Sequence, residues 1–141
     1  MKNIIKPIAT AKGGEIFYVD FSQDEFYLGG SSFAQSQECI GNDTPGVTDA
    51  VYFKRAFNTV QDHIKAGKIS AGHDIGSGGL ITSLLELCFP SLNIGMDLDF
   101  SCLEETDLVK ILFSEKAKII QQKNIFHGYQ SEVKVTSNKS I

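Results

Sequence analysis

The pattern of hydrophobic and polar positions predicts strands in several parts of this chain. Residues 15–21 (EIFYVDF) are rich in aromatic and β-branched side chains, which favour a strand. Residues 26–28 predict a second short strand, and the polar turn before them is compatible with a hairpin. Residues 92–100 (LNIGMDLDF) alternate strictly, which indicates a half-buried strand with Asp97 and Asp99 on its other face. Those two acids could bind a cation, but a solvated strand face explains them more simply.

A period of 3.6 residues predicts a helix over 49–66. Four apolar residues lie at i, i+4, i+7 and i+11 and so share one face of this helix. Phe57 is at the centre of that face and is expected to be buried. Thr48 or Asp49 is expected to cap the helix, and Gly67 follows its end. The four apolar residues are Phe53, Phe57, Val60 and Ile64.

Shorter patterns complete the expected order of elements. Residues 69–71 predict a strand, and residues 80–89 predict a helix whose wide apolar face indicates packing on two sides. A further helix is expected over 103–114, followed by strands at 117–121 and 132–136. The residues expected to face inward from the helix over 103–114 are Leu108, Ile111 and Leu112.

This order of strands and helices indicates an α/β (α+β) fold, a mixed β-sheet covered by helices. The expected hairpin would pair strands antiparallel, while the strand–helix–strand passages allow parallel pairing elsewhere. A chain of 141 residues is long enough for one domain with a buried core. We expect that domain at 15–122, with a leader or linker at 1–14. Residues 123–141 are expected to be a polar tail with one short strand, the rest of which frays.

Composition and charge exclude several classes of protein. The net charge of −4 argues against a nucleic-acid binder, which would need a basic surface. Cysteines at 39, 88 and 102 are too few and too scattered for a disulfide framework or a zinc site. The first residues lack the apolar core of a signal peptide, and no apolar run approaches the roughly 20 residues of a membrane helix. A cytoplasmic protein without a membrane partner is expected.

The stretch 67–90 carries the strongest candidate chemistry. A short strand leads into a polar bend with His73 and Asp74, and the bend leads into a helix. Free backbone N–H groups and the positive end of a helix make such a bend a candidate anion or nucleotide site. A tight turn capped by Ser77 is an equally good explanation. The glycine spacing matches no standard phosphate, dinucleotide or nucleophile motif. The bend residues are Gly76, Ser77, Gly78 and Gly79.

A second passage of the same kind lies at 29–32. Residues 26–28 run into Gly29, Gly30, Ser31 and Ser32, and a helical stretch follows. This turn could also hold an anion at a helix N-terminus. A hydroxyl cap after a glycine turn explains it equally well.

Four motifs in order resemble the phosphoribosylformylglycinamidine synthase family, a group of large purine-biosynthetic amidoligases. The similarity is to the C-terminal domain of the second half of these enzymes, which is like aminoimidazole ribonucleotide (AIR) synthetase. It covers about residues 12–121. The motifs are FYLGGSSFAQ (26–35), GNDTPGVTDA (41–50), GHDIGSGGLITSLLELCF (72–89) and LVKILFSE (108–115).

The resemblance implies an ATP-dependent reaction that uses Mg²⁺. Formylglycinamide ribonucleotide, glutamine, ATP and water would give the amidine, glutamate, ADP and phosphate. The family also implies a glutaminase domain with a catalytic cysteine and a channel for ammonia. In the family the second half resembles an auxiliary nucleotide site that retains ADP, while catalysis belongs to the first half. We therefore expect no catalytic residue on this chain.

The family motif assigns roles to individual residues of the bend. Asp74 falls on a magnesium-coordinating aspartate, and a hard carboxylate suits Mg²⁺. Gly76 stands where the family has a nucleotide-contacting serine, while Ile75 and Ser77 replace an arginine and a second acid. The expected nucleotide or phosphate contacts are Gly76, Ser77, Gly78 and Gly79 in one turn and Gly30, Ser31 and Ser32 in the other.

The same resemblance implies that the chain is one domain of a longer enzyme and is inactive alone. Its expected partners are the remaining domains of the parent synthase and a nucleotide. The alternative function is a noncatalytic structural or subunit-contact module that binds no nucleotide of its own. In either case an apolar sheet face left uncovered would favour self-association.

Overall fold

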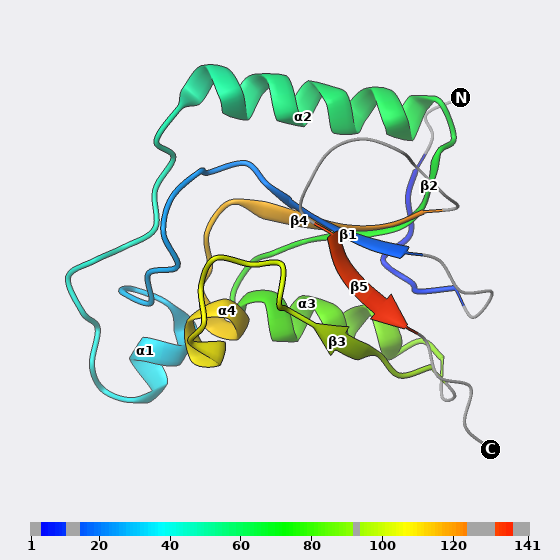
Figure 1. Ribbon diagram of the computed structural model, residues 1–141. Helices are drawn as coiled ribbons and strands as arrows, with labels where there is room; N and C mark the ends of the chain where they lie inside the picture. Colours follow the sequence, from blue (N-terminus) through cyan, green and yellow to red (C-terminus); the bar gives the residue numbers. More distant parts are fainter. Residues whose placement is uncertain (1–3, 11–14, 92–93, 124–131, 137–141) are drawn as a thin grey trace.

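The computed structural model describes residues 4–10, 15–91, 94–123 and 132–136 (Figure 1). Helices lie on both sides of a β-sheet, so the expected α/β arrangement is confirmed. Above the sheet in Figure 1 lies α2 (Ala50–Lys65), and below it lie α3 (Gly79–Cys88) and α4 (Leu108–Phe113). The short helix α1 (Ser32–Ser36) lies beside α4.

The five strands form one sheet in the order β2-β4-β1-β5-β3. All pairs of named strands are antiparallel, and the parallel component among the described residues is an isolated bridge between Lys6 and Ala71. The strand predicted over 117–121 is present as β4, and the one predicted over 132–136 as β5. The strands are β1 (Glu15–Asp20), β2 (Ile69–Asp74), β3 (Asp97–Asp99), β4 (Lys118–Lys123) and β5 (Glu132–Thr136).

The predicted hairpin over 15–28 is wrong. The first strand β1 forms, but residues 26–28 are not a strand, and β1 pairs with the distant β4 and β5. The cause is local at Asp20, whose carboxylate accepts hydrogen bonds from the backbone N–H (2.8 Å) and hydroxyl (2.7 Å) of Ser22 and so turns the chain. Phe26 then packs its ring against two lysine side chains of the β4 end instead of pairing with β1.

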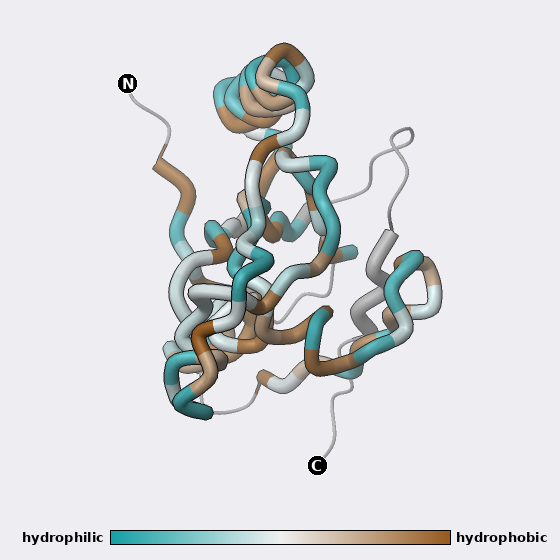
Figure 2. The backbone as a smooth tube through the Cα atoms, turned by 90° about the vertical axis from the view of Figure 1, so that its left-hand side faces the viewer, coloured by the Kyte–Doolittle hydropathy of each residue, from teal (hydrophilic) through white to brown (hydrophobic). Residues whose placement is uncertain are grey.

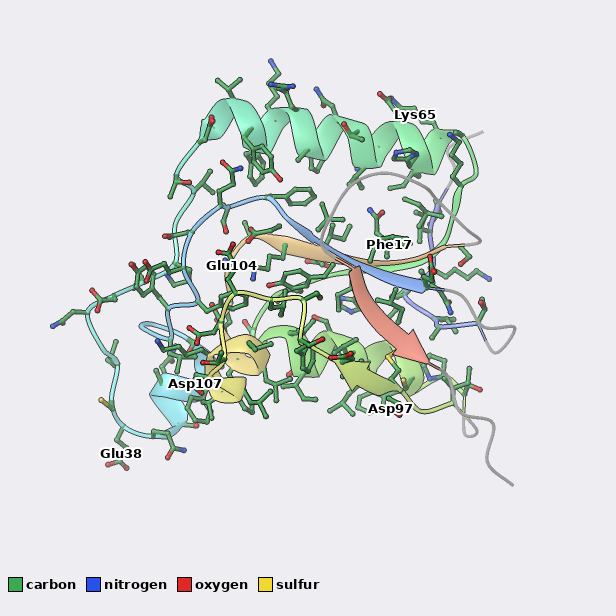
Figure 3. The ribbon with its side chains drawn as sticks, in the orientation of Figure 1. Phe17, Glu38, Lys65, Asp97, Glu104 and Asp107 are labelled. Carbon is green, nitrogen blue, oxygen red and sulfur yellow. The ribbon has the colours of Figure 1, made fainter. Side chains whose placement is uncertain are left out.

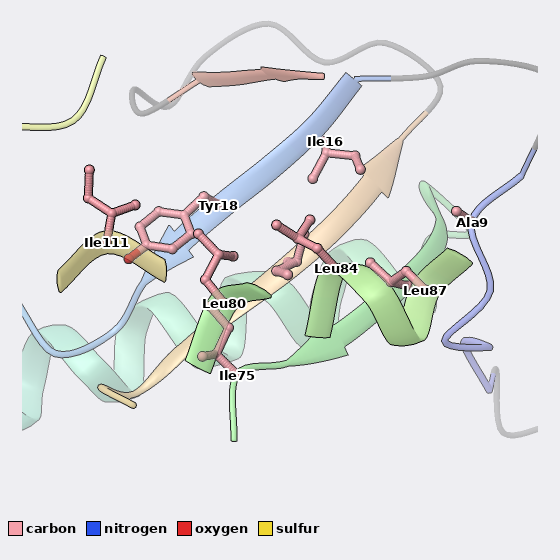
Figure 4. Packing of buried hydrophobic residues seen from close by; sticks show 9 residues of the cluster. Ala9, Ile16, Tyr18, Ile75, Leu80, Leu84, Leu87 and Ile111 are labelled. Atoms are coloured by element: carbon pink, nitrogen blue, oxygen red, sulfur yellow. The ribbon is translucent and has the colours of Figure 1, made fainter. Parts of the chain in front are cut away.

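The hydrophobic core lies between the sheet and the two helices below it. Strand residues from β1 and β4 face α3, and Ile111 of α4 closes one end of the cluster (Figure 4). Residues 4–10 contribute as well, because Ala9 is buried and its N–H donates to the Leu87 carbonyl at 2.8 Å. The core cluster comprises Ala9, Ile16, Tyr18, Ile75, Leu80, Leu84, Leu87, Ile111 and Ile120.

The helix predicted over 49–66 is present as α2, but its predicted burial is only partly correct. The Asp49 carboxylate caps it by accepting from the backbone N–H groups of Val51 and Tyr52, and Gly67 follows with φ 67°. Val60 is buried, whereas Phe57 is 44% exposed, so the prediction that Phe57 is buried is wrong. Phe57 contacts Phe21, at 6.2 Å between ring centroids, and stacks on Phe53, at 6.4 Å. Figure 2 views this helix end-on.

Both elements predicted between residues 92 and 114 are shorter than expected. The strand covers Asp97–Asp99, with both acids exposed (Asp97 is labelled in Figure 3), and residues 92–93 lie outside the described part of the chain. The helix begins at Leu108 because the Asp107 carboxylate caps it there, at 2.9 Å from the Val109 N–H. Leu108 is therefore at the free end and is 57% exposed, which corrects its predicted inward position, while Ile111 is buried as predicted.

The helix predicted over 80–89 is present as α3 and packs against both β2 and α4. Three leucines on its inner face, together with Ser83, are buried. Leu85 and Phe89 are exposed, so the wide apolar surface of this helix is not fully covered within the chain. The buried leucines are Leu80, Leu84 and Leu87.

Candidate functional site

The predicted bend begins later than the sequence suggested, because His73 and Asp74 are the last two residues of β2. The Asp74 side chain is 90% exposed and its nearer carboxylate oxygen lies 3.6 Å from Nδ1 of His73. His73 packs between the strand and α3, with Nε2 at 3.0 Å from a carboxylate oxygen of Glu86. The strand therefore presents Asp74 to solvent at its end, while the His73 side chain is partly buried against Glu86 of α3.

The turn after β2 is held by backbone contacts. The Ile75 N–H donates to the Lys118 carbonyl at 3.0 Å, which anchors the start of the turn to β4. Gly78, with φ 88°, is the N-terminal capping residue of α3 and supplies no side-chain cap. The alternative in which Ser77 caps the helix is therefore wrong, and the Ser77 side chain is exposed.

The second turn, at 29–32, has the hydroxyl cap that was one of the two predictions for it. The buried Ser31 hydroxyl donates to the Leu28 carbonyl at 2.6 Å and accepts from the Ala34 N–H at 3.1 Å. The Gly30 N–H donates to the Ile40 carbonyl at 2.8 Å. Ser31 and Gly30 thus use their polar groups to build this turn.

Glu115 joins the two turns, which are far apart in the sequence. Its Oε1 atom accepts a hydrogen bond from the Ser32 N–H at 2.8 Å and another from the Gly78 N–H at 2.7 Å. Partial burial raises the pKa of the Glu115 carboxyl, but the hydrogen bonds from Gly78 and Ser32 outweigh it, so the pKa lies below its ordinary value. A carboxylate of the protein itself thus occupies the N-terminal end of α3.

This carboxylate changes the interpretation of the candidate phosphate contacts. The N–H groups of Gly30, Ser31, Ser32, Gly78 and Gly79 all donate to acceptors within the protein. Within the described part of the chain, the backbone N–H groups of Gly76 and Ser77 have no such acceptor, and both residues are exposed. The two turns are brought together as neighbours, but only Gly76 and Ser77 keep backbone donors for an outside ligand beside Asp74.

Gly79 fixes the position of this turn against α4. Its φ is 72°, and a Cβ atom built on it would lie 2.5 Å from the carbonyl oxygen of Leu112 and 2.7 Å from Cα of Phe113. Only glycine combines that left-handed conformation with so close an approach of two backbones. Phe113 also stacks on Phe33 of α1, with ring centroids 4.6 Å apart, so the three helices meet near Glu115.

A buried pair of lysines near the start of β4 was not foreseen from the sequence. Lys116 Nζ lies 2.9 Å from an Asp20 carboxylate oxygen and also donates to the Asp24 carbonyl. Lys118 Nζ lies 3.9 Å from that oxygen, packs over the rings of Phe26 and Tyr18, and has no hydrogen-bond partner among the described residues. Burial lowers the pKa of Lys118 to about 6.

The donor set around Asp74 fits Mg²⁺ only as a shared ligand. No group of three or more histidine, cysteine, aspartate or glutamate residues gathers in a metal-binding arrangement within the described ranges. Mg²⁺ commonly takes one or two carboxylates and completes its coordination with phosphate oxygens and water. An exposed Asp74 beside free backbone donors is compatible with a metal that arrives with a nucleotide.

Other features of the described chain have no role in this site. No helix in the described part is both long and apolar enough to cross a bilayer. The thiols of Cys39 and Cys88 form no disulfide, and partial burial raises the pKa of Cys88.

Sequence reasoning missed Glu115, although this residue ends the motif 108–115. In the sequence Glu115 is only an acidic residue just after a predicted helix, and the apolar period of that helix does not include it. Nothing local in the sequence indicates that its partners are Ser32 and Gly78.

Comparison with known proteins gives consistent results. A family profile described as AIR synthase related protein, C-terminal domain, matches residues 27–120. A probable phosphoribosylformylglycinamidine synthase of Arabidopsis thaliana is 39% identical over 107 residues, which are 76% of this chain and 8% of that protein. The human phosphoribosylformylglycinamidine synthase is 32% identical over 107 residues, which are again 76% of this chain and 8% of the relative.

A solved structure, T. maritima PurL complexed with AMPPCP, superposes with a TM-score of 0.56 at 18% identity. The match covers 85% of this chain and 18% of that one. At this level of identity the match shows that the fold is shared. The chain spans about 8% of the length of the Arabidopsis and human relatives.

Proposed function

The chain belongs to the family of AIR synthase related proteins, as their C-terminal domain, and from this premise we propose that it is a domain of a phosphoribosylformylglycinamidine synthase. We place it in the second AIR-synthetase-like half of that enzyme. The parent reaction would convert formylglycinamide ribonucleotide to formylglycinamidine ribonucleotide, with ATP and glutamine, in purine biosynthesis. We also place it in the cytoplasm, whereas the Arabidopsis relative is named chloroplastic/mitochondrial.

The role we propose for this domain is to contribute to an auxiliary Mg²⁺-nucleotide site. The observation that carries the proposal is Asp74 at the solvent-exposed end of β2, directly before a turn whose Gly76 and Ser77 N–H groups remain free. Asp74 would hold the metal, and the two backbone donors would contact a phosphate. The bound metal would neutralise phosphate charge. Gly78, Gly79, Gly30, Ser31 and Ser32 would shape the site, since their own N–H groups are engaged.

The remaining parts of such an enzyme would lie on other domains, which are the proposed partners. Generation of ammonia needs a glutaminase. Phosphoryl transfer needs several clamps and metal contacts, which one carboxylate and two backbone donors do not supply. We therefore expect the 141-residue chain alone to be inactive in amidine synthesis.

Titration of the isolated chain with Mg·ADP in a calorimeter tests the proposed site. We expect binding no tighter than about 1 mM, equivalent to roughly −4 kcal/mol, because the chain supplies only part of the site. Asp74→Asn should weaken it further, whereas Asp97→Asn, which changes an exposed acid on β3, should leave it unchanged. Tight binding that does not depend on Asp74 would contradict the proposed metal role.

A noncatalytic subunit-contact module is the second candidate. Exposed apolar side chains on α3 and α4 favour it, because such residues commonly pack against another domain or a second copy. This candidate predicts concentration-dependent self-association by light scattering and no response to Mg·ADP. The residues are Leu85, Phe89, Leu108 and Val109.

A further inference from the structure

Glu115 connects two glycine–serine turns that no other side chain in the described structure joins. One oxygen atom, Oε1, accepts from the Ser32 N–H at 2.8 Å and from the Gly78 N–H at 2.7 Å. Glu105 makes a useful comparison, because its Oε1 atom also accepts from two backbone N–H groups, at 2.8 and 2.9 Å. The partners of Glu105 all lie within five residues of it: the Thr106 and Asp107 N–H groups, and Lys110, whose Nζ is 3.5 Å from Oε2. That carboxylate therefore organises only a local segment.

The position of the Glu115 carboxylate is one that an anion would otherwise fill. Gly78 is the N-terminal capping residue of α3, a ten-residue helix, and has no side chain to satisfy the N–H groups there. The helix dipole favours negative charge at this end. Glu115, which follows the C-terminal end of α4, supplies that charge, and the same atom satisfies the Ser32 N–H of the neighbouring turn.

We infer that Glu115 is a positioning residue: its carboxylate takes the place of a bound anion between the two turns and so fixes Gly76 and Ser77 beside Asp74. This inference deepens the proposed function and rests on it for the nucleotide. A nucleotide phosphate is excluded from the space between the turns by like charge. It is directed instead to the rim formed by Gly76 and Ser77, where a nucleoside diphosphate could share Mg²⁺ with Asp74.

Amide hydrogen exchange of the full chain, followed residue by residue by NMR, tests the connection without any nucleotide. Glu115→Ala should increase exchange at both the Ser32 and Gly78 amides, by about tenfold or more, because both lose a charged acceptor. Glu105→Ala removes a matched pair of hydrogen bonds and should leave those two amides unchanged. A folded Glu115→Ala protein with unchanged exchange at either amide would overturn the inference.

Chemical rescue separates an anion position from a general packing role. Sodium formate should restore protection at both amides of Glu115→Ala, while sodium chloride at equal ionic strength should not. If Glu115→Ala does not fold, Glu115→Gln serves instead, since it keeps the shape and an acceptor oxygen but removes the charge. We expect faster exchange at Ser32 and Gly78 together in that variant. No change at either amide, or rescue by chloride as effective as by formate, would count against the inference.

A nucleotide measurement distinguishes this inference from the proposed function. Mg·ADP added to the wild-type chain should shift the Gly76 and Ser77 amide resonances, and Glu115→Gln should reduce the affinity several-fold, whereas Glu105→Ala should not. If the exchange results hold but wild-type Mg·ADP causes no shifts, the connection stands and the proposed nucleotide site fails. If Mg·ADP instead shifts Gly76 and Ser77 equally in wild-type and Glu115→Gln proteins, Glu115 is not a positioning residue.

Discussion

At the scale of single residues, Gly79 is constrained twice, by its left-handed φ and by the α4 backbone. Gly79→Ala should lower the free energy of unfolding by more than the roughly 1–2 kcal/mol that the left-handed conformation alone costs an alanine. The excess arises because the new Cβ would lie 2.5 Å from the Leu112 carbonyl oxygen. Urea unfolding provides the measurement. Gly76→Ala is the control, since a Cβ there meets nothing within 4 Å, and an equal loss in both variants would contradict the argument.

Lys118 is a second residue whose environment makes a measurable prediction. Because burial lowers its folded pKa to about 6 while the unfolded pKa is near 10.5, the unfolded chain binds more protons between these values. The contribution of Lys118 to stability therefore rises with pH from about 6 upward, by at most about 1.4 kcal/mol per pH unit. Lys118→Met should remove this contribution and raise stability at pH 6, since it replaces a buried amine without a hydrogen-bond partner.

Urea unfolding of wild-type and Lys118→Met proteins at pH 6 and pH 8 measures this effect. The difference in stability between the two proteins should be larger at pH 6. Asp20 keeps its ion pair with Lys116 at 2.9 Å in the variant, so no carboxylate is left unpaired. A difference that is constant with pH, or larger at pH 8, would show that the Lys118 amine is already charged in the folded protein.

At the scale of elements, α3 and α2 differ in how firmly they join the sheet. Leu87 of α3 is 1% exposed, and Leu87→Ala should cost about 2–5 kcal/mol by opening a cavity. Phe57→Ala in α2 should cost only about 1 kcal/mol. The Phe57 side chain is larger than that of Leu87, but its ring is about half exposed, so less apolar surface returns to water. Thermal or urea unfolding of the two variants gives the comparison. A loss for Phe57→Ala as large as for Leu87→Ala would mean that α2 packs more closely than the exposure indicates.

At the scale of the whole molecule, the chain matches a small part of its relatives, so the decisive variant belongs in a full-length synthase. Asp74→Asn there keeps the shape of the side chain and removes one negative charge beside the proposed metal. We expect it to loosen retained ADP and lower thermal stability, and to reduce turnover much less, because the proposed site is an auxiliary one. Nucleotide content after purification, melting temperature and steady-state kinetics are the readouts. Complete loss of turnover in a folded Asp74→Asn enzyme would make this domain a direct participant in catalysis.

Elements with a strong local signal were predictable from the sequence. The helix α2 was identified by its period, by Asp49 as its cap and by Gly67 at its end, all of which act within a few residues. The strand β4 and the helix α3 were likewise found close to their observed positions. The hairpin failed because an aromatic segment at 26–28 has strand character but finds its partners in distant lysines.

The sequence by itself therefore determined the fold class, most of the elements, the family and the position of Asp74 beside a glycine-rich turn, because these depend on short-range patterns and on motifs in order. Only the tertiary structure decided that both turns meet at Glu115. It also decided that, of the candidate phosphate-contact residues in the two turns, Gly76 and Ser77 are the ones that keep free backbone N–H donors. The physical reason is that a hydrogen bond between residues far apart in the chain leaves no period in the sequence. Such a bond exists only once α3, α4 and the two turns have packed together.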